Sequence, residues 1–131
     1  MNRVVHFEIY ASNPERAIVF YKSVFGWTFE KWGEQEYWMV MTAPKGSDEM
    51  GVNGGLMPRP NSMEPKDSEA VSGFVCTMQV ENIDDTIEKI LKEGGKIAME
   101  KFAIPEMAWQ AYYRDTEGNI FGIHQPDPNA K

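Results

Sequence analysis

A histidine and a carboxylate two positions apart, His6 and Glu8, are the residues near the start of the chain with the clearest chemical potential. They lie in the alternating stretch 4–11, which predicts a β-strand whose every second side chain shares a face. His6, Glu8 and Tyr10 then share one face, with the first two about 6.6 Å apart along the strand. Such a pair can move a proton near neutral pH or hold a cation. A half-buried histidine beside a solvated glutamate is the structural alternative.

The elements that follow must position this strand. Asn13 is typical of a helix N-cap, and Gly26 suits the left-handed position that ends a helix. The alternating stretches 27–32 and 37–41, which a polar turn separates, predict a β-hairpin. Residues 51–57 predict a weak strand, because glycines add an entropy cost and no packing.

The second half of the chain repeats this order. Composition shifts at 58–72 to Pro, Ser, Asn and charged residues, which predicts a surface linker. At an offset of 69 residues, Asn13 aligns with Asn82 and Gly26 with Gly95. The repeat predicts a second unit of strand, capped helix and three strands. The expected strands of this unit span 73–80, 96–102, 109–114 and 119–124.

Composition limits the class of protein. The 131 residues, 42% of them hydrophobic, fit one globular domain, and no apolar run approaches the ~20 residues of a membrane span. The start of the chain lacks the pattern of a signal peptide, so we expect a soluble, cytoplasmic protein. The lone Cys76 cannot form an internal disulfide and is expected to be a buried, small apolar residue. A net charge of −7 opposes nucleic-acid and anionic-membrane partners, whereas a cationic or neutral small ligand is easily accommodated.

Two segments resemble a known family. The sequences VVHFEIYASNPERAIVFYKSVFGWTF (4–29) and RDTEGNIFGIHQP (114–126) are similar to the opening and closing segments of the vicinal oxygen chelate superfamily. This superfamily includes glyoxalase I, extradiol dioxygenases, and bleomycin and fosfomycin resistance proteins. The resemblance implies an α+β fold in which two βαβββ modules form a cupped, eight-stranded incomplete barrel with helices outside. A single glyoxalase-like domain would span 1–131, with modules at about 1–60 and 73–128, and would form a homodimer.

The resemblance also implies where a metal would bind. In metal-using members, side chains on the first, fourth, fifth and eighth strands hold a divalent ion. His6 matches the first position, but the others fall at Gly54 or Gly55, at Val75 and at Gly122, none of which can coordinate. We therefore expect no cofactor.

A displaced divalent site made of His6, Glu8 and His124 remains the alternative, since two histidines and a carboxylate suit Fe(II) or Zn(II). The simpler interpretation is a metal-free cup that binds a small molecule. Its expected lining is His6, Glu8, Tyr10, Thr77, Trp109 and His124, with Trp38 and Tyr113 as further contributors.

Two functions follow from this lining. The first is a binding protein in which aromatic side chains stack on a small organic molecule and Glu8 supplies a counter-charge. The second is a lyase, isomerase or dioxygenase-type enzyme in which His6 or Glu8 moves a proton beside a carbonyl, with or without a displaced metal. The chain contains no phosphate-binding loop, nucleophile motif or HExxH, so kinase, serine hydrolase and zinc protease activities have no support.

Overall fold

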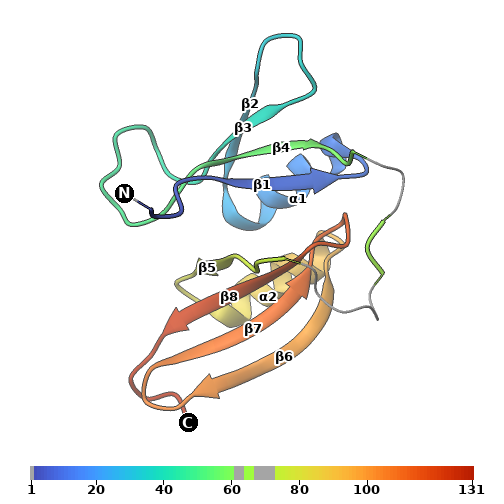
Figure 1. Ribbon diagram of the computed structural model, residues 1–131. Helices are drawn as coiled ribbons and strands as arrows, with labels where there is room; N and C mark the ends of the chain where they lie inside the picture. Colours follow the sequence, from blue (N-terminus) through green and yellow to red (C-terminus); the bar gives the residue numbers. More distant parts are fainter. Residues whose placement is uncertain (1, 61–63, 67–72) are drawn as a thin grey trace. The chain divides into compact units, whose positions relative to one another are not determined.

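The computed structural model describes residues 2–60, 64–66 and 73–131, and the chain divides into two compact units, Met1–Glu64 and Pro65–Lys131 (Figure 1). Most of the predicted linker, at 61–63 and 67–72, lies outside the described residues.

The first unit holds one helix and a four-stranded mixed sheet. Strand β1 pairs in parallel with β4, and β4, β3 and β2 pair antiparallel in the order β1-β4-β3-β2. The predicted hairpin is confirmed by the pairing of β2 with β3. The elements are β1 (Phe7–Ala11), α1 (Pro14–Phe25), β2 (Thr28–Lys31), β3 (Trp38–Met41) and β4 (Gly54–Pro58).

The second unit repeats the first. Its sheet has the order β5-β8-β7-β6, again with a parallel pair at one edge and antiparallel pairs elsewhere. The predicted internal repeat is therefore confirmed at the level of element order. The elements are β5 (Thr77–Gln79), α2 (Ile83–Lys92), β6 (Lys96–Ile104), β7 (Ala108–Arg114) and β8 (Ile120–Pro126).

The helix starts confirm the capping prediction. The Asn13 side chain accepts a hydrogen bond from the Arg16 amide at 3.1 Å, and the Asn82 side chain accepts one from the Asp85 amide at 3.0 Å. Each bond satisfies an amide that the first helical turn leaves without a backbone partner. Gly26, with φ at 72°, ends α1 in the left-handed conformation that glycine tolerates.

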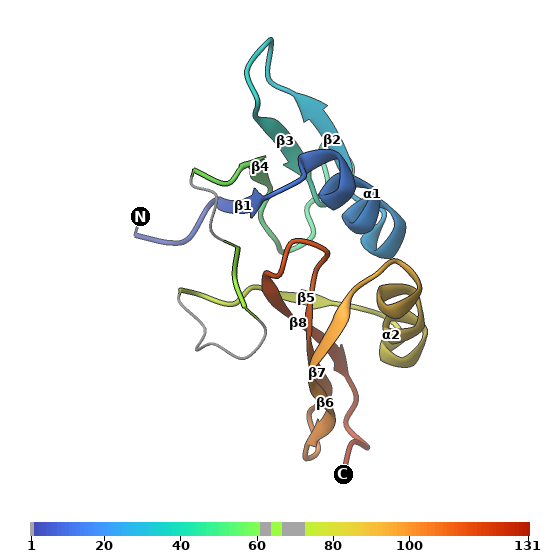
Figure 2. The same cartoon turned by 90° about the vertical axis from the view of Figure 1, so that its right-hand side faces the viewer.

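Each helix packs on one face of its own sheet (Figures 1 and 2). In the first unit, Phe20 of α1 is buried, as are Val40 of β3 and Leu56 of β4. In the second unit, Ile90 of α2 and Ile123 of β8 are buried. Because strand side chains alternate, the face opposite each helix carries a separate set of residues.

Cys76 differs from its prediction. The expected strand 73–80 forms ladder pairs only from Thr77 to Gln79. Cys76 precedes these pairs and is exposed, as is Phe74 two residues earlier, so the prediction that Cys76 is buried is wrong. The apolar composition of 73–80 predicts one continuous strand. In the structure, β8 pairs with only three residues of this segment, Thr77 to Gln79.

The fold class is the predicted one: α+β, with two four-stranded mixed sheets and two helices of the glyoxalase-like type. The cup that both sheets would form together stays a prediction. No helix in the described part of the chain has the length and apolar character needed to cross a membrane.

Candidate functional site

Three side chains of the first unit form a hydrogen-bonded group, which we call the triad: His6, Tyr37 and Glu8. The Tyr37 hydroxyl lies 2.9 Å from His6 Nε2 and 3.1 Å from Glu8 Oε2. His6 directly precedes β1 and Glu8 lies within it, whereas Tyr37 directly precedes β3. The shared face that the sequence predicted for His6 and Glu8 therefore contains a third member that the sequence reasoning missed.

Gly55 explains how Tyr37 reaches β1. Strand β4 lies between β3 and β1, and Gly55 is the residue paired with Glu8. A Cβ atom on Gly55 would collide with the Tyr37 hydroxyl and ring. The missing side chain thus leaves room for the phenol to cross the central strand. In the sequence, a glycine in a predicted strand indicates that another group can approach the backbone closely. Only the strand order shows that this group is the Tyr37 side chain.

The environment of Tyr37 keeps its phenol protonated. Burial raises the pKa of Tyr37 above its ordinary value of 10, and the hydrogen bond to Glu8 and the charge of Glu8 raise it further, with a smaller electrostatic contribution from Tyr10. At neutral pH the hydroxyl therefore keeps its proton. Because a carboxylate only accepts, Tyr37 donates this proton to Glu8.

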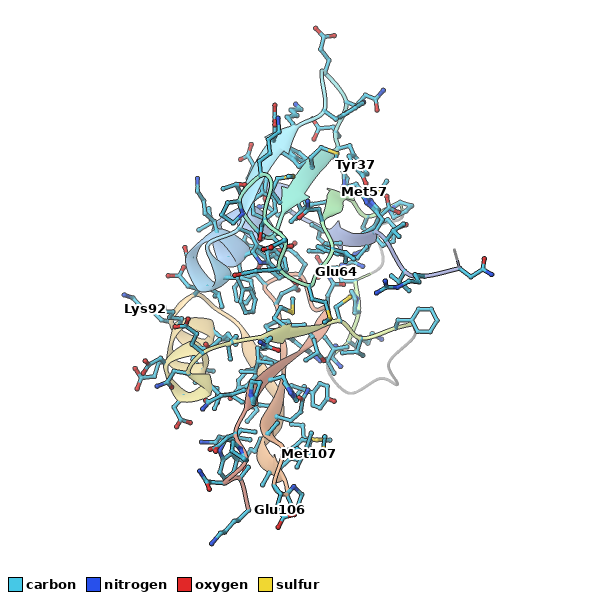
Figure 3. The ribbon with its side chains drawn as sticks, turned by 90° about the vertical axis from the view of Figure 1, so that its left-hand side faces the viewer. Tyr37, Met57, Glu64, Lys92, Glu106 and Met107 are labelled. Carbon is cyan, nitrogen blue, oxygen red and sulfur yellow. The ribbon has the colours of Figure 1, made fainter. Side chains whose placement is uncertain are left out.

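Apolar and sulfur-containing side chains surround the triad on the same face. In the ladder, Tyr10 pairs with Met57 and Gly55 pairs with Met39, and directly paired residues project to the same side. Tyr37 and Met57 project from the first sheet in Figure 3. Methionine side chains are flexible and polarisable, so they adapt to ligands of different shape. We call this surface the triad face; it consists of His6, Glu8, Tyr10, Tyr37, Met39 and Met57.

Trp38 does not share the triad face. It pairs with Leu56, which is fully buried in the core of this unit. The Lys31 ammonium lies 5.6 Å from the centre of the Trp38 ring. Since Trp38 follows Tyr37 directly, its side chain projects to the side of α1, contrary to the expected lining.

The second unit brings together Thr77, Gln110 and His124. His124 pairs with Gln110 in the ladder, and His124 Nδ1 lies 2.8 Å from Gln110 Oε1. A Cβ on Gly122 would lie 2.6 Å from Thr77 Oγ1 and 2.9 Å from Gln110 Nε2, so these polar groups close the space above Gly122. Thr77 pairs with Gly122 as Glu8 pairs with Gly55.

Trp109 and Tyr113 lie on the other face of this sheet, because each is an odd number of residues from Gln110. The Trp109 indole donates to Asp127 at 3.0 Å, and the Lys101 ammonium lies 4.6 Å from its ring centre. Lys101 also bonds to Asp84 of α2 at 2.9 Å. Both aromatic residues thus lie on the helix side and do not join Thr77 and His124, contrary to the expected lining.

Three of the four expected ligand positions do not fit the metal site that the family resemblance implies. The expected ligand positions are Gly54 or Gly55 on β4 and Gly122 on β8, and at each of them neighbouring atoms occupy the space that a ligand side chain would need. Val75, the position expected on the fifth strand, precedes β5 in the structure and its side chain offers no coordinating atom. Across the described ranges, no group of three or more His, Cys, Asp and Glu side chains could hold a metal ion.

The displaced site stays a prediction. His6 and Glu8 belong to the unit Met1–Glu64, whereas His124 belongs to Pro65–Lys131. There His124 Nδ1 already has Gln110 as its partner.

Solved structures share this fold across nearly the whole chain. A glyoxalase family protein from Bacillus cereus has a TM-score of 0.72 at 17% identity, covering 96% of this chain and 95% of that one. A genomically encoded fosfomycin resistance protein from Listeria monocytogenes has a TM-score of 0.71 at 13% identity, covering 95% and 93%. A glyoxalase-related enzyme from Fulvimarina pelagi has a TM-score of 0.69 at 15% identity, covering 95% and 88%.

Sequence comparison assigns the family. A glyoxylase-like domain-containing protein of Didymella fabae is 28% identical over 121 residues, which cover 88% of this chain and 88% of that protein. The model of the Glyoxalase/Bleomycin resistance protein/Dioxygenase superfamily matches residues 3–123. With nearly the whole chain matched and both repeated modules in place, the chain belongs to the glyoxalase/bleomycin resistance protein/dioxygenase superfamily.

Proposed function

We propose that this protein binds a small organic molecule on the triad face without a metal ion. The observation that carries the proposal is the position of Tyr37. Its hydroxyl fills the space of a side chain on Gly55 and bonds to both His6 and Glu8. At the fourth-strand position, where the family resemblance implies a metal ligand, the Tyr37 phenol occupies the space and bonds to His6 and Glu8.

The chemistry of the triad face suits a small ligand with one polar and one apolar part. Polar atoms of His6, Tyr37 and Glu8 fix orientation, while the methionines and Tyr10 offer apolar surface. Binding sites for small molecules generally combine a few convergent polar groups with such a surface. Glu8, exposed on this face, supplies the negative charge that a cationic ligand needs.

Proton-transfer catalysis is the second candidate, and the hydrogen-bonded chain His6–Tyr37–Glu8 favours it. Such a chain connects an imidazole to a carboxylate, the two groups needed to remove and return a proton beside a carbonyl. The enzyme would then be a lyase, isomerase or dioxygenase-type member of the superfamily. The raised pKa of Tyr37 keeps its phenol protonated, so Tyr37 itself is not the base. Because His6 and Glu8 are exposed to water rather than enclosed, we place binding ahead of catalysis.

A thermal-shift screen of small cationic and neutral compounds tests the binding proposal. The screen compares the wild type with Glu8→Gln, which keeps shape and hydrogen-bonding capacity but removes the charge. We expect Glu8→Gln to remain folded, with a stability change within about 1 kcal/mol. Glu88→Gln on the exposed side of α2 is the matched control, because it makes the same change away from the triad.

Cationic binders should raise the melting temperature of Glu8→Gln less than that of the wild type and of Glu88→Gln. Neutral binders should raise the melting temperature of all three proteins by the same amount. Equal shifts of every binder in the wild type and in Glu8→Gln would remove Glu8 from the site. The absence of any binder among chemically diverse compounds would contradict the proposed function.

A further inference from the structure

We propose that the triad selects ligands that carry N–H donors on a positive charge, that is, primary or secondary organic ammonium ions. This inference rests on the proposed binding function and names its ligand class. It follows from the direction of the hydrogen bonds within the triad.

The direction is fixed by the number of protons available. The Glu8 carboxylate can only accept, so the single hydroxyl proton of Tyr37 is directed to Glu8 Oε2 at 3.1 Å. The Tyr37 oxygen then has only lone pairs to offer to His6. His6 Nε2, at 2.9 Å, must therefore carry a hydrogen and donate it to Tyr37.

This direction leaves two acceptor atoms available to a ligand. When Nε2 carries the hydrogen, the neutral imidazole of His6 has its lone pair on Nδ1. Glu8 also has a second carboxylate oxygen, Oε1. Within the described part of the chain, neither His6 Nδ1 nor Glu8 Oε1 has a hydrogen-bond partner. Two exposed acceptors without a protein partner, one of them charged, complement a ligand that brings several donors.

The charges on the same face agree with this class. One row of paired residues crosses the four strands of this sheet: Glu8, Gly55, Met39 and Glu30. Glu30 therefore places a second carboxylate on the same side of the sheet as Glu8. Lys31, the next residue, lies over the Trp38 ring on the other face and 3.5 Å from Glu36. The side of the sheet that carries the triad face is thus acidic at two positions in one row, Glu8 and Glu30.

Three probes of equal aromatic body separate charge from donors: benzylamine, benzyltrimethylammonium and benzyl alcohol. At about pH 8 the amine keeps its proton and has charge and N–H donors. The trimethyl compound has the charge without donors, and the alcohol has a donor without the charge. Backbone amide NMR titrations of the full chain give both the dissociation constant and the location of binding.

We expect benzylamine to bind with a dissociation constant at least about tenfold below those of the other two probes. Benzyl alcohol loses the close charge pair, and benzyltrimethylammonium loses the charge-assisted hydrogen bonds. The amides of β1 and of Gly55 should shift. Glu8→Gln should remove the preference for benzylamine, and Glu88→Gln should retain it. Tyr37→Phe should reduce the preference with the Glu8 charge intact, because the phenyl ring no longer sets the direction of the bonds.

Equal affinity for benzylamine and benzyltrimethylammonium would overturn the inference, as would shifts confined to residues outside the triad face. No binding of benzylamine up to about 10 mM by a natively folded protein would also overturn it. If benzyl alcohol binds at the triad face and benzylamine does not, the ligand class is wrong while the proposed function stands. If the wider screen yields no ligand of any class, the proposed function itself fails.

Discussion

The Tyr37 hydroxyl connects two residues that are separated from it by about thirty positions in the chain, His6 and Glu8. The period of a strand was enough to predict that His6 and Glu8 share a face. For Tyr37 the sequence predicts only a place in a hairpin, since nothing in the local pattern indicates which distant residue its hydroxyl reaches. Its partner became visible only with the order β1-β4-β3 and the register that sets Gly55 beside Glu8.

The ionisation of Tyr37 is directly measurable. Because burial and Glu8 raise its pKa above 10, the phenolate absorbance that Tyr37→Phe removes should appear only at a pH above 10. In Glu8→Gln this component should shift to lower pH. Tyr113, whose pKa burial also raises, is present in all three proteins and cancels in the difference.

The same shift sets the sign of a stability change. The unfolded chain loses the Tyr37 proton near pH 10, before the folded chain does, so the free energy of unfolding should fall as pH rises above 10. The fall should be smaller in Tyr37→Phe. A phenolate component of Tyr37 that titrates at or below pH 10 would contradict a half-buried phenol bonded to Glu8.

At the scale of elements, β4 is a glycine-rich strand between β1 and β3, and its glycines have a structural role. Gly54 and Gly55 weaken the strand intrinsically, yet β4 pairs with neighbours on both sides. We expect Gly55→Ala to lower the free energy of unfolding by about 1–3 kcal/mol, because its new Cβ meets Tyr37. Urea unfolding measures this loss.

A double-mutant cycle shows whether Tyr37 is the cause. In a Tyr37→Ala background, the cost of Gly55→Ala should largely disappear. Gly54→Ala is the matched control, because its Cβ would lie 2.5 Å from the backbone oxygen of Phe7, which Tyr37→Ala does not remove. An unchanged cost of Gly55→Ala in both backgrounds would show that Tyr37 does not occupy the space above Gly55.

Elements were predicted better than faces. Asn13, Asn82 and Gly26 act on neighbouring backbone groups, so their roles are readable locally. The faces of Trp38, Trp109 and Tyr113 depend on strand register, and a shift of one residue moves a side chain to the opposite side of a sheet. Trp109 illustrates this, since its neighbour Gln110 faces His124 while Trp109 itself contacts Asp127 and Lys101.

At the scale of the whole molecule, we predict a homodimer. Among the described residues, several large apolar side chains are strongly exposed, including Phe74 and Met50 at 98% or more of their full accessibility. Exposed apolar surface is typical of an interface, and two-fold dimers are the commonest assemblies. Sedimentation equilibrium at micromolar concentration should give a mass near twice the chain mass of 15.0 kDa. A mass near that of one chain would contradict the prediction.

The central claim is that the hydrogen-bonded triad, and not a bound metal, forms the site of this superfamily member. Metal analysis of the purified chain after incubation with Fe(II), Zn(II) or Mn(II) and removal of excess ion tests it directly. The account predicts well under one metal ion per chain, with no difference between the wild type and His6→Ala. One tightly bound transition-metal ion per wild-type chain, lost in His6→Ala together with ligand binding, would contradict it.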